Sequence, residues 1–372
     1  MRKLPFKSSQ VLSLGVELEL QIIDPATYGL IPRAKDLIRI IRESPFRDQI
    51  KPEITQSMIE INSSIHQTPS EMYADLIQAR DYLLQLSVQL GVKFSGGGTH
   101  PFQKWALQKI FPSQRFKHIY RRFRYLSKCS TVFGQHIHIG CANADDALYL
   151  THALARYVPQ FIAITANSPF YQGEDTGFYS SRSNVFSSFP LSGIIPYLIT
   201  WREFSDYFYK MRNLGIVKTM KDFYWDVRPK PEFGTVEIRV CDTPLTIEKA
   251  IDITAYIQTL SSYLLKNKPI KISNDLYYIY NYNRFQASRF GLDGSFINPM
   301  TLQQDSIGND ILETIEILKI YADDLNNSKY LEKIKTKIIN KDDDANFLRQ
   351  VEKQTNSLSQ VVHAQCLLWE KN

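Results

Sequence analysis

The sequence predicts an α+β fold, and three features of the chain lead to this expectation. Stretches with the period-two alternation of strands recur between residues 11 and 241. These stretches do not alternate with helices regularly enough for a doubly wound parallel sheet. Beyond Thr246 the pattern is mostly helical. We therefore expect a single domain over residues 1–372, with the sheet within residues 1–300 and a helical tail over residues 301–372 packed on it.

The composition is that of a globular protein. Of 372 residues, 44% are hydrophobic and 22% are charged, and the formal net charge is +6. These values exclude a disordered chain, a collagen and a coiled-coil rod, but the mild positive charge selects neither an anionic small ligand nor a nucleic acid. No run approaches the roughly 18 apolar residues of a membrane span, and no signal peptide is evident, so we expect a cytoplasmic protein. Four cysteines without a CxxC pair indicate neither a disulfide framework nor a zinc ribbon.

The individual elements follow from periodicity and from turn residues. Strands are expected over residues 11–23, 51–62, 92–97, 133–139, 222–228 and 233–241. Helices are expected over residues 68–90, 113–127, 143–166, 246–266, 308–323, 327–339 and 344–369. Thr68 or Ser70 can cap the first of these helices, with Pro69 in its first turn. We expect residues 268–300, which are rich in Tyr and Asn, to be irregular.

Short strands that present polar side chains at period two carry the chemistry. Glu17 and Glu19 flank Leu18, so both carboxylates point to one face, where they would repel each other unless a cation lies between them. Mg²⁺ and Mn²⁺ prefer such oxygen ligands. His136 and His138 repeat the arrangement around Ile137 and suit a metal or a phosphate. A solvent-exposed strand face and two half-buried histidines are the alternatives.

Two further acids are seven residues apart, at Glu53 and Glu60. An odd separation on a straight strand places side chains on opposite faces. Both can reach one site only if the segment bends or bulges, or if Glu53 precedes the strand. Otherwise they are surface glutamates.

The last two strands each pair an acid with an arginine, in Asp226-Val-Arg228 and Glu237-Ile-Arg239. If these strands pair across the turn at 229–235, four charges gather on one surface of the sheet. The acids would then serve a metal, and the arginines would bind phosphate or carboxylate through their planar guanidinium groups. Cross-strand salt bridging is the alternative.

Weaker signals lie elsewhere in the chain. Arg182, in a polar run at 179–184, could bind an anion or form a loop salt bridge. The arginines at 121, 122 and 124, with Phe123 and Tyr125, look like an RNA-binding cluster, but at helical spacing such residues are more often a solvated basic face. No established nucleic-acid motif accompanies them, so we expect no nucleic-acid partner.

Several motifs together resemble one family in the same order along the chain. They are Gly15-Val-Glu-Leu-Glu19, Ile59-Glu-Ile-Asn62, Gln135-His-Ile-His-Ile-Gly140, Asn167-Ser-Pro-Phe170, Trp225-Asp-Val-Arg-Pro229 and Thr235-Val-Glu-Ile-Arg-Val-Cys-Asp242. The family is the bacterial carboxylate–amine ligases, also called type-two glutamate–cysteine ligases. The resemblance covers about residues 10–300, and Asn283-Arg284, Arg289 and Gly291-Leu-Asp-Gly294 extend it. Many members have three successive glutamates after Gly-Val, whereas Leu18 separates the two acids here.

The resemblance implies a glutamine-synthetase-like fold, in which a curved antiparallel sheet forms an open funnel with helices outside. It implies one catalytic domain that uses Mg-ATP, with Mg²⁺ or Mn²⁺, to join a glutamate-like carboxylate and an amine through an acyl phosphate. The implied metal ligands are Glu17, Glu19, Glu53, Glu60, His136 and Glu237. The implied nucleotide-binding residues are His138, Arg182, Arg239, Asn283 and Arg289. Arg239, Arg228 and Asp226 are the implied catalytic group, with Arg239 on the transferring phosphoryl.

Two other functions use a related sheet and stay open at this point. One is a guanidino-type phosphotransferase, which would need a reactive cysteine such as Cys141 or Cys241. The other is a non-catalytic ATP-binding protein. Because an acyl phosphate hydrolyses easily, we also expect a covering segment, at 171–189 or 281–294. The scattered aromatic residues and apolar late helices leave room for a homodimer.

Overall fold

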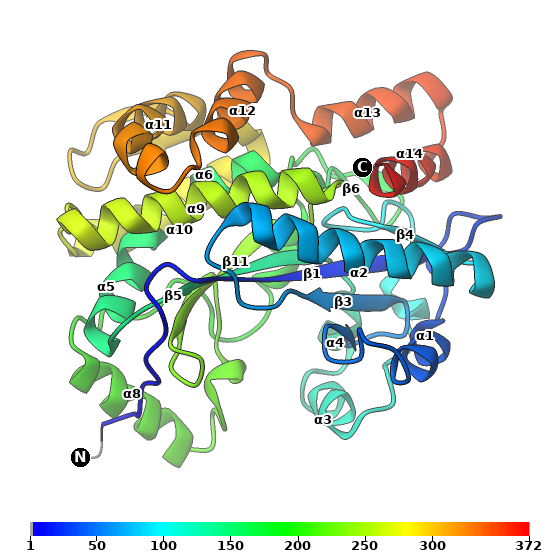
Figure 1. Ribbon diagram of the computed structural model, residues 1–372, viewed down its shortest axis with the longest axis horizontal. Coiled ribbons are helices and arrows are strands. Elements are labelled where there is room, and N and C mark those ends of the chain that lie inside the picture. Colours follow the sequence, from blue (N-terminus) through cyan, green and yellow to red (C-terminus); the bar gives the residue numbers. More distant parts are fainter. Residues whose placement is uncertain (1–2, 372) are drawn as a thin grey trace.

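The computed structural model describes residues 3–371 and has a seven-stranded antiparallel sheet at its centre (Figure 1). The strands lie in the order β10–β11–β5–β1–β3–β2, and β4 pairs with the end of β1. Their bounds are β1 Leu14–Ile23, β2 Ile50–Pro52, β3 Met58–Asn62, β4 Lys93–Ser95, β5 Gly134–Gly140, β10 Val227–Lys230 and β11 Thr235–Asp242. A shift of register between Ile238 and Cys241 marks an irregularity in the pairing of β11 with β5.

The alternation along each strand gives the sheet one apolar and one polar face. Leu18, Ile137 and Ile238 are fully buried on the apolar face. Their neighbours Glu17, His136 and Glu237 therefore lie on the opposite face. Leu18 thus points away from the two acids that flank it, as the sequence predicts.

Helices cover the apolar face. In Figure 1, α2 (Pro69–Leu90) and α9 (Ile247–Asn267) run above the strands, and both pack against β1. The remaining helices of this layer are α5 Ala144–Ala155, α6 Val158–Thr165, α10 Asn274–Phe290, α11 Ile307–Asp324, α12 Ser328–Ile339, α13 Asp344–Thr355 and α14 Leu358–Glu370. None of the helices within residues 3–371 is long and apolar enough to cross a membrane.

On the other side of the sheet, short helices flank the polar face as two separate groups. Figure 1 shows α8 (Trp201–Asn213) at the lower left, and α1 (Ala34–Ile41), α3 (Gln114–Phe123) and α4 (Tyr125–Cys129) at the lower right. The smaller elements are β6 Phe170–Tyr171, β7 Glu174–Asp175, α7 Arg182–Phe186, β8 Ser192–Gly193, β9 Tyr224–Trp225, β12 Ser295–Ile297 and β13 Gln304–Ser306.

The α+β prediction is confirmed, and several elements match closely. The strands expected at 11–23, 133–139 and 233–241 are β1, β5 and β11. The helix expected at 68–90 is α2, where Thr68 and Glu71 form a capping box. These elements are determined by residues within the elements themselves, such as the capping pair and the alternating apolar side chains. The sequence alone is therefore sufficient to predict where these elements lie.

The prediction of an irregular segment at 268–300 is wrong, because it contains the 17-residue helix α10. Its Tyr and Asn residues have modest helix propensity, but packing compensates. Leu276, Tyr280 and Ala287 are buried at helical spacing, and α10 packs against α6.

Three predicted helices are each divided in two. The helix expected at 143–166 breaks into α5 and α6 ahead of Pro159, which takes the first turn of α6. The helices expected at 113–127 and 344–369 break at Arg124 and Asn356, which have φ angles of 50° and 48°. A left-handed residue ends a helix, and neither residue is a glycine that would have indicated it.

A buried ion pair joins the C-terminal helices to the helical layer. Arg156, between α5 and α6, donates two hydrogen bonds to the carboxylate of Asp310 on α11. The guanidinium also lies over the rings of Tyr157 and Phe296, at 4.4 and 4.6 Å from their centroids. Gln160 donates to Asp310 and accepts from the Tyr256 hydroxyl. Both carboxylate oxygens of Asp310 and both terminal nitrogens of Arg156 are thus hydrogen-bonded while buried.

We expect Asp310→Ala to lower the free energy of unfolding by about 3–5 kcal/mol, because it leaves the buried Arg156 charge uncompensated. Denaturant unfolding monitored by circular dichroism measures this change. Glu316→Ala, on the same helix as Asp310, removes two exposed ion pairs, with Lys319 of α11 and with Lys335 of α12. It is the matched control and should leave the midpoint essentially unchanged. Equal midpoints for both variants would contradict the structural role of the buried pair.

Candidate functional site

Strand pairing brings the polar residues of five strands to one place. Glu17 lies opposite His136, and Glu237 lies opposite both His138 and Arg228. On the other side of β1, Glu19 lies opposite Glu60. Because directly opposed residues share a face, these side chains converge on the polar side of the sheet.

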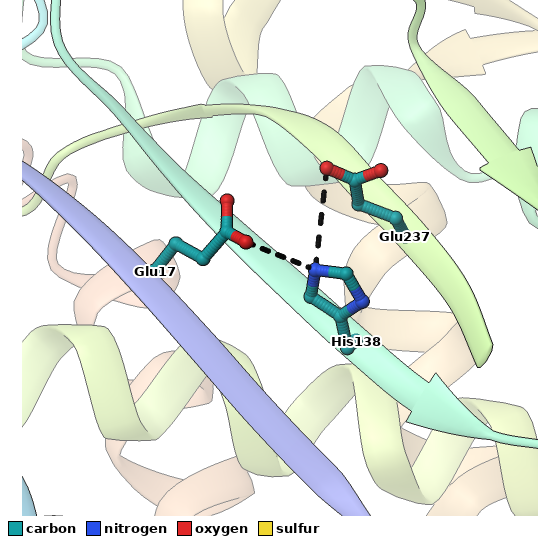
Figure 2. Close-up of side chains that lie close together, drawn as sticks. All are labelled: Glu17, His138 and Glu237. Carbon is teal, nitrogen blue, oxygen red and sulfur yellow. Dashed lines mark ion pairs between the residues drawn. The ribbon is translucent and has the colours of Figure 1, made fainter. Parts of the chain in front are cut away.

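One group consists of Glu17, His138 and Glu237, which come from β1, β5 and β11 (Figure 2). A ligand atom from each lies within 4.8 Å of the others. Nε2 of His138 points between the two carboxylates, 3.5 Å from Glu17 Oε1 and 4.0 Å from Glu237 Oε1. The other ring nitrogen, Nδ1, is 3.0 Å from the Thr235 hydroxyl, which fixes the orientation of the ring.

A second group consists of Glu19, Glu53 and Glu60, whose ligand atoms also lie within 4.8 Å of one another. Glu53 belongs to the turn between β2 and β3, so the strand expected at 51–62 is a hairpin. Because of this turn, two glutamates that are seven residues apart reach one site, whereas on a straight strand they would lie on opposite faces. Asn62 donates to Glu60 at 2.7 Å, and the Gly134 amide donates to Glu19 at 2.6 Å.

His136 lies between the two groups. Its Nδ1 is 2.9 Å from Glu17 Oε2, and its Nε2 is 3.9 Å from Glu19 Oε1. Burial, and then the charge of Arg239, lower the pKa of His136 to about 4. The imidazole is therefore neutral at physiological pH, which is the form that binds metals. Nε2 of His136 and Nε2 of His138 are both buried without a hydrogen-bond partner in the structure.

The charges of the two groups are unequal. Burial and the neighbouring Glu53 charge raise the pKa of Glu19 to about 8. Burial also raises the pKa of Glu53, and burial with the charges of Glu17, Glu53 and Glu19 raises that of Glu60 well above its usual range. These three carboxyls need protons or a cation to share one site.

Glu17 and Glu237 behave in the opposite way. Burial alone would raise the pKa of Glu237, but the charges of Arg228 and Arg239 hold it well below its usual range. Hydrogen bonds to His136 and His138 hold the pKa of Glu17 well below its usual range, although burial alone would raise it. Both carboxylates are therefore ionised, and they remain acceptors for a further cation.

Two arginines close the group around Glu237. Arg228 donates from Nε to Glu237 at 2.5 Å, and Arg239 donates from Nη1 at 2.7 Å. The cross-strand salt bridge that sequence reasoning kept as an alternative is therefore present, but it is shared with a second arginine. Arg228 also donates to the Phe223 carbonyl at 2.6 Å, which fixes its guanidinium in place.

Asp226 does not join this surface, which corrects the expectation that four charges gather there. Its carboxylate accepts from the Tyr280 hydroxyl at 2.6 Å and from Arg284 Nε at 2.7 Å, both on α10. Asp226 precedes β10 where the chain is tied to Gly193 beside β9, and strict alternation ends there. In this structure Asp226 therefore anchors α10 to the sheet.

Of the residues expected at the nucleotide, Arg182 lies beside the cluster and two others do not. Arg182 packs against Gly134 and donates to the carbonyl of Arg239 at 3.2 Å, and its buried Nε has no hydrogen-bond partner among residues 3–371. Asn283 uses both ends of its amide on the backbone of Ile297 in β12. Arg289 donates to the Gly177 carbonyl and so ties the segments 171–189 and 281–294 together. The contacts of Asn283 and Arg289 give no support for a nucleotide role.

Sequence reasoning missed two cations at the edge of the cluster. Arg115 on α3 acts on Glu53 with its positive charge, which lowers the pKa of that carboxyl but does not outweigh the effect of burial. Lys221, between α8 and β9, lies within the field of Glu17 and of Arg115. In the sequence, Arg115 belongs to a basic helix with the pattern of a solvent-exposed one. Nothing in the sequence indicates that this helix lies beside the sheet.

Comparison with known proteins gives the relatives of this chain. The family model described as "Glutamate-cysteine ligase family 2 (GCS2)" matches residues 13–364. "Putative glutamate--cysteine ligase 2-1" of Legionella pneumophila (strain Corby) is 58% identical over 99% of this chain and 96% of its own length. A protein named "Putative glutamate--cysteine ligase 2" of Herminiimonas arsenicoxydans is 49% identical over 98% and 99%.

Solved structures confirm the fold expected from the family resemblance. The glutamate–cysteine ligase of Francisella tularensis, solved in complex with AMP, superposes with a TM-score of 0.74 at 10% identity, over 99% of this chain and 91% of that one. A bifunctional glutathione synthetase from Pasteurella multocida gives a TM-score of 0.66 at 13% identity, over 96% of this chain and 51% of that one. From its matches in sequence and fold, the chain belongs to glutamate–cysteine ligase family 2 and, with it, to the ATP-dependent carboxylate–amine ligases.

Proposed function

We propose that the cluster on the polar sheet face is the active site of this ligase. There a glutamate-like carboxylate attacks the γ-phosphorus of ATP, which releases ADP and forms an acyl phosphate. An amine then attacks the acyl carbon, and the amide forms with loss of phosphate and a proton. The observation that carries the proposal is the convergence of five glutamates, two histidines and two arginines from β1, β3, β5, β10, β11 and the β2–β3 turn.

The donor set fits divalent cations such as Mg²⁺ or Mn²⁺. Glu17, His138 and Glu237 would hold one ion, and Glu19, Glu53 and Glu60 another. The buried Nε2 atoms without partners and the raised pKa values of the second group both support this assignment. Bound ions would neutralise phosphate oxygens. His136, which sequence reasoning assigned to a metal, would bridge the two groups, and His138, assigned there to the phosphates, would be a ligand.

The chain's own residues have separable roles. Arg239 would stabilise charge that develops on the transferring phosphoryl, because an arginine presents several donors to phosphate oxygens in fixed geometry. Arg228 would be a positioning residue, since it holds Glu237 and is itself fixed by the Phe223 carbonyl. Arg182, with its unpartnered buried Nε, would contribute a further donor from the edge of the cluster.

Glutamate and cysteine as substrates are part of the proposal, supported by the printed names of the relatives. ATP use agrees with the AMP in the Francisella tularensis structure. A cytoplasmic location is supported by four free cysteines, which suit a reducing compartment. A homodimer is supported by the exposed Tyr278, Tyr282 and Phe285 along one face of α10.

The cysteines of this chain argue against a guanidino-type phosphotransferase. Such an enzyme would need a reactive thiolate near the acceptor. Cys141 and Cys241 are buried, and burial raises the pKa of each thiol to about 12. Neither supplies a thiolate at physiological pH, so the phosphotransferase has no nucleophile-activating cysteine at these positions.

We expect Glu237→Gln to lower kcat for ADP release by about 10²–10³-fold, because the uncharged amide no longer compensates Arg228 and Arg239 or accepts a cation. ADP release is measured with Mg-ATP, L-glutamate and L-cysteine, and ATP binding is followed by calorimetry. Glu316→Gln, exposed on α11, is the control with the same change of charge. If Glu237→Gln releases ADP as fast as the wild type, the site assignment is wrong. If the wild type turns over at all, the alternative of a non-catalytic ATP-binding protein is excluded.

Electron paramagnetic resonance with Mn²⁺ tests the donor groups without relying on turnover. The wild type should bind two ions per chain, one for each group. Glu60→Gln should remove or weaken one ion at least tenfold, since it takes a charged ligand from the second group only. Binding of a single ion by the wild type, or unchanged stoichiometry and affinity in Glu60→Gln, would contradict the assignment.

A further inference from the structure

The charge of the chain is distributed very unevenly. Residues 82–144 contain nine lysines and arginines and no aspartate or glutamate, whereas the rest of the chain has 35 basic and 38 acidic side chains. This segment holds α3 and α4, which lie beside the polar face of the sheet in Figure 1. The net positive charge is therefore local, and six of the nine cations lie within residues 114–129, on α3 and α4 and between them.

The cations of α3 are exposed and continue onto a second element. Within residues 3–371, no ion pair involves Arg115, Lys117, Arg121 or Arg122. Arg122 donates to the Ile216 carbonyl at 2.6 Å, which fastens α3 to the segment that carries Lys218 and Lys221. We call the six residues Arg115, Lys117, Arg121, Arg122, Lys218 and Lys221 the basic rim.

The basic rim reaches the cluster itself. Arg115 acts on Glu53, and the Lys221 carbonyl is 3.5 Å from Nη1 of Arg228. Burial and the positive charges of Arg115 and Lys230 lower the pKa of Lys221. Cations of different segments therefore face one another across the entrance, and an anion between them would relieve their repulsion.

A groove of about 1710 Å³ extends from Lys221 along α8. Its walls are largely apolar and include Leu198, Tyr207 and Met220, with Lys210 and Arg212 among its cations. A site for one small molecule is about 300–1,000 Å³, so this groove is long enough for an extended ligand. It also touches Pro231 and Glu232, next to Phe233, whose ring centroid is 6.3 Å from that of His138.

The acids of the groove do not cancel its positive charge. Five cations and three acids line it, the acids being Glu203, Asp206 and Glu232. Glu203 caps the start of α8, and Glu232 is paired with Lys230 at 3.1 Å. Lys210 and Arg212 are exposed and have no ion pair in the described part of the chain. A ligand in this groove would thus meet apolar contacts together with unpaired cations.

We propose that this ligase accepts, besides a small amine such as cysteine, an acidic peptide as an amine substrate, which lies in the α8 groove and enters the active site past the basic rim. This inference rests on the proposed ligase function. The amino terminus of the peptide attacks the acyl carbon, the bond from that carbon to the phosphate oxygen breaks, and phosphate leaves with the electron pair while the amine loses a proton. Helices cover the other face of the sheet, so the acceptor must arrive from this side.

A peptide fits these surfaces better than a single-stranded nucleic acid does. The peptide supplies the amine that ligation consumes and apolar side chains for Leu198, Tyr207 and Met220, while its carboxylates pair with the cations. A nucleic acid would need bases stacked along the basic path. The aromatic residues of α3 are instead engaged within the protein, since Phe123 packs on Phe189 and Tyr224.

Fluorescence anisotropy of the full chain without ATP tests the peptide site. The probe is a hexaglutamate peptide with a free amino terminus and a dye at its carboxyl end, compared with hexaglutamine and hexalysine. We expect hexaglutamate to bind at least tenfold more tightly than either, and more weakly as salt increases. Equal affinity of hexaglutamate and hexaglutamine would overturn the proposal.

Matched variants separate the groove from overall charge. Lys210→Glu with Arg212→Glu should weaken hexaglutamate binding at least tenfold. Lys329→Glu with Lys353→Glu, both exposed on α12 and α13, changes the net charge equally and should weaken it less than twofold. Equal loss in both pairs would overturn the proposal, and so would tighter binding of a 12-nucleotide single strand that the groove variant abolishes.

Turnover distinguishes this inference from the proposed function. Incorporation of hexaglutamate into an amide, detected by mass spectrometry, supports both. ADP release with cysteine but without peptide binding overturns the inference and leaves the ligase in place. Peptide binding without ADP release from any amine overturns the ligase function, and the acceptor role fails with it.

Discussion

The arrangement of this protein depends on crowding negative charge onto one partly buried face of its sheet. Five carboxylates would repel one another strongly in a medium of low dielectric constant. Two of them, Glu17 and Glu237, remain ionised because histidines and arginines surround them. The other three have raised pKa values and are suited to share a cation. The same repulsion that makes the site costly to fold makes it able to hold metals and phosphates.

The rest of the fold supports this face. The apolar side of each strand packs on α2 and α9, which fixes the register and so the spacing of the acids. Asp226 and Arg284 attach α10 to the sheet edge, and Arg156 with Asp310 attaches α11 to the helical layer. Both are buried pairs whose hydrogen bonds are satisfied, so they position elements without competing for the ligands of the site.

Much of the site could be predicted from the sequence because the acids and histidines alternate along strands. Glu17 with Glu19 and His136 with His138 share a face by local geometry alone. Glu53 with Glu60 could not be settled in this way, because the turn that unites them is not indicated by glycine or proline between them. The prediction that Asp226 shares a face with Arg228 was wrong because strict alternation ends at the start of β10. The helix α10 forms because it packs against the rest of the protein, although the helix propensity of its Tyr and Asn residues is modest. The position of Arg115 beside Glu53 likewise depends on tertiary packing, which the sequence pattern does not show.

Family membership gives the class of reaction. The geometry of the structure adds the proposed roles of the individual site residues and the basic rim at the entrance to the site. The proposed reaction depends on an acyl phosphate formed at the cluster. Its most direct test uses L-glutamate labelled with ¹⁸O in the carboxylate, Mg-ATP and an amine, with the released phosphate examined by mass spectrometry. Transfer of one ¹⁸O atom from the carboxylate to phosphate for each amide formed is the result that this account predicts. Unlabelled phosphate alongside labelled amide product would contradict it, because the carboxylate would then never have been phosphorylated.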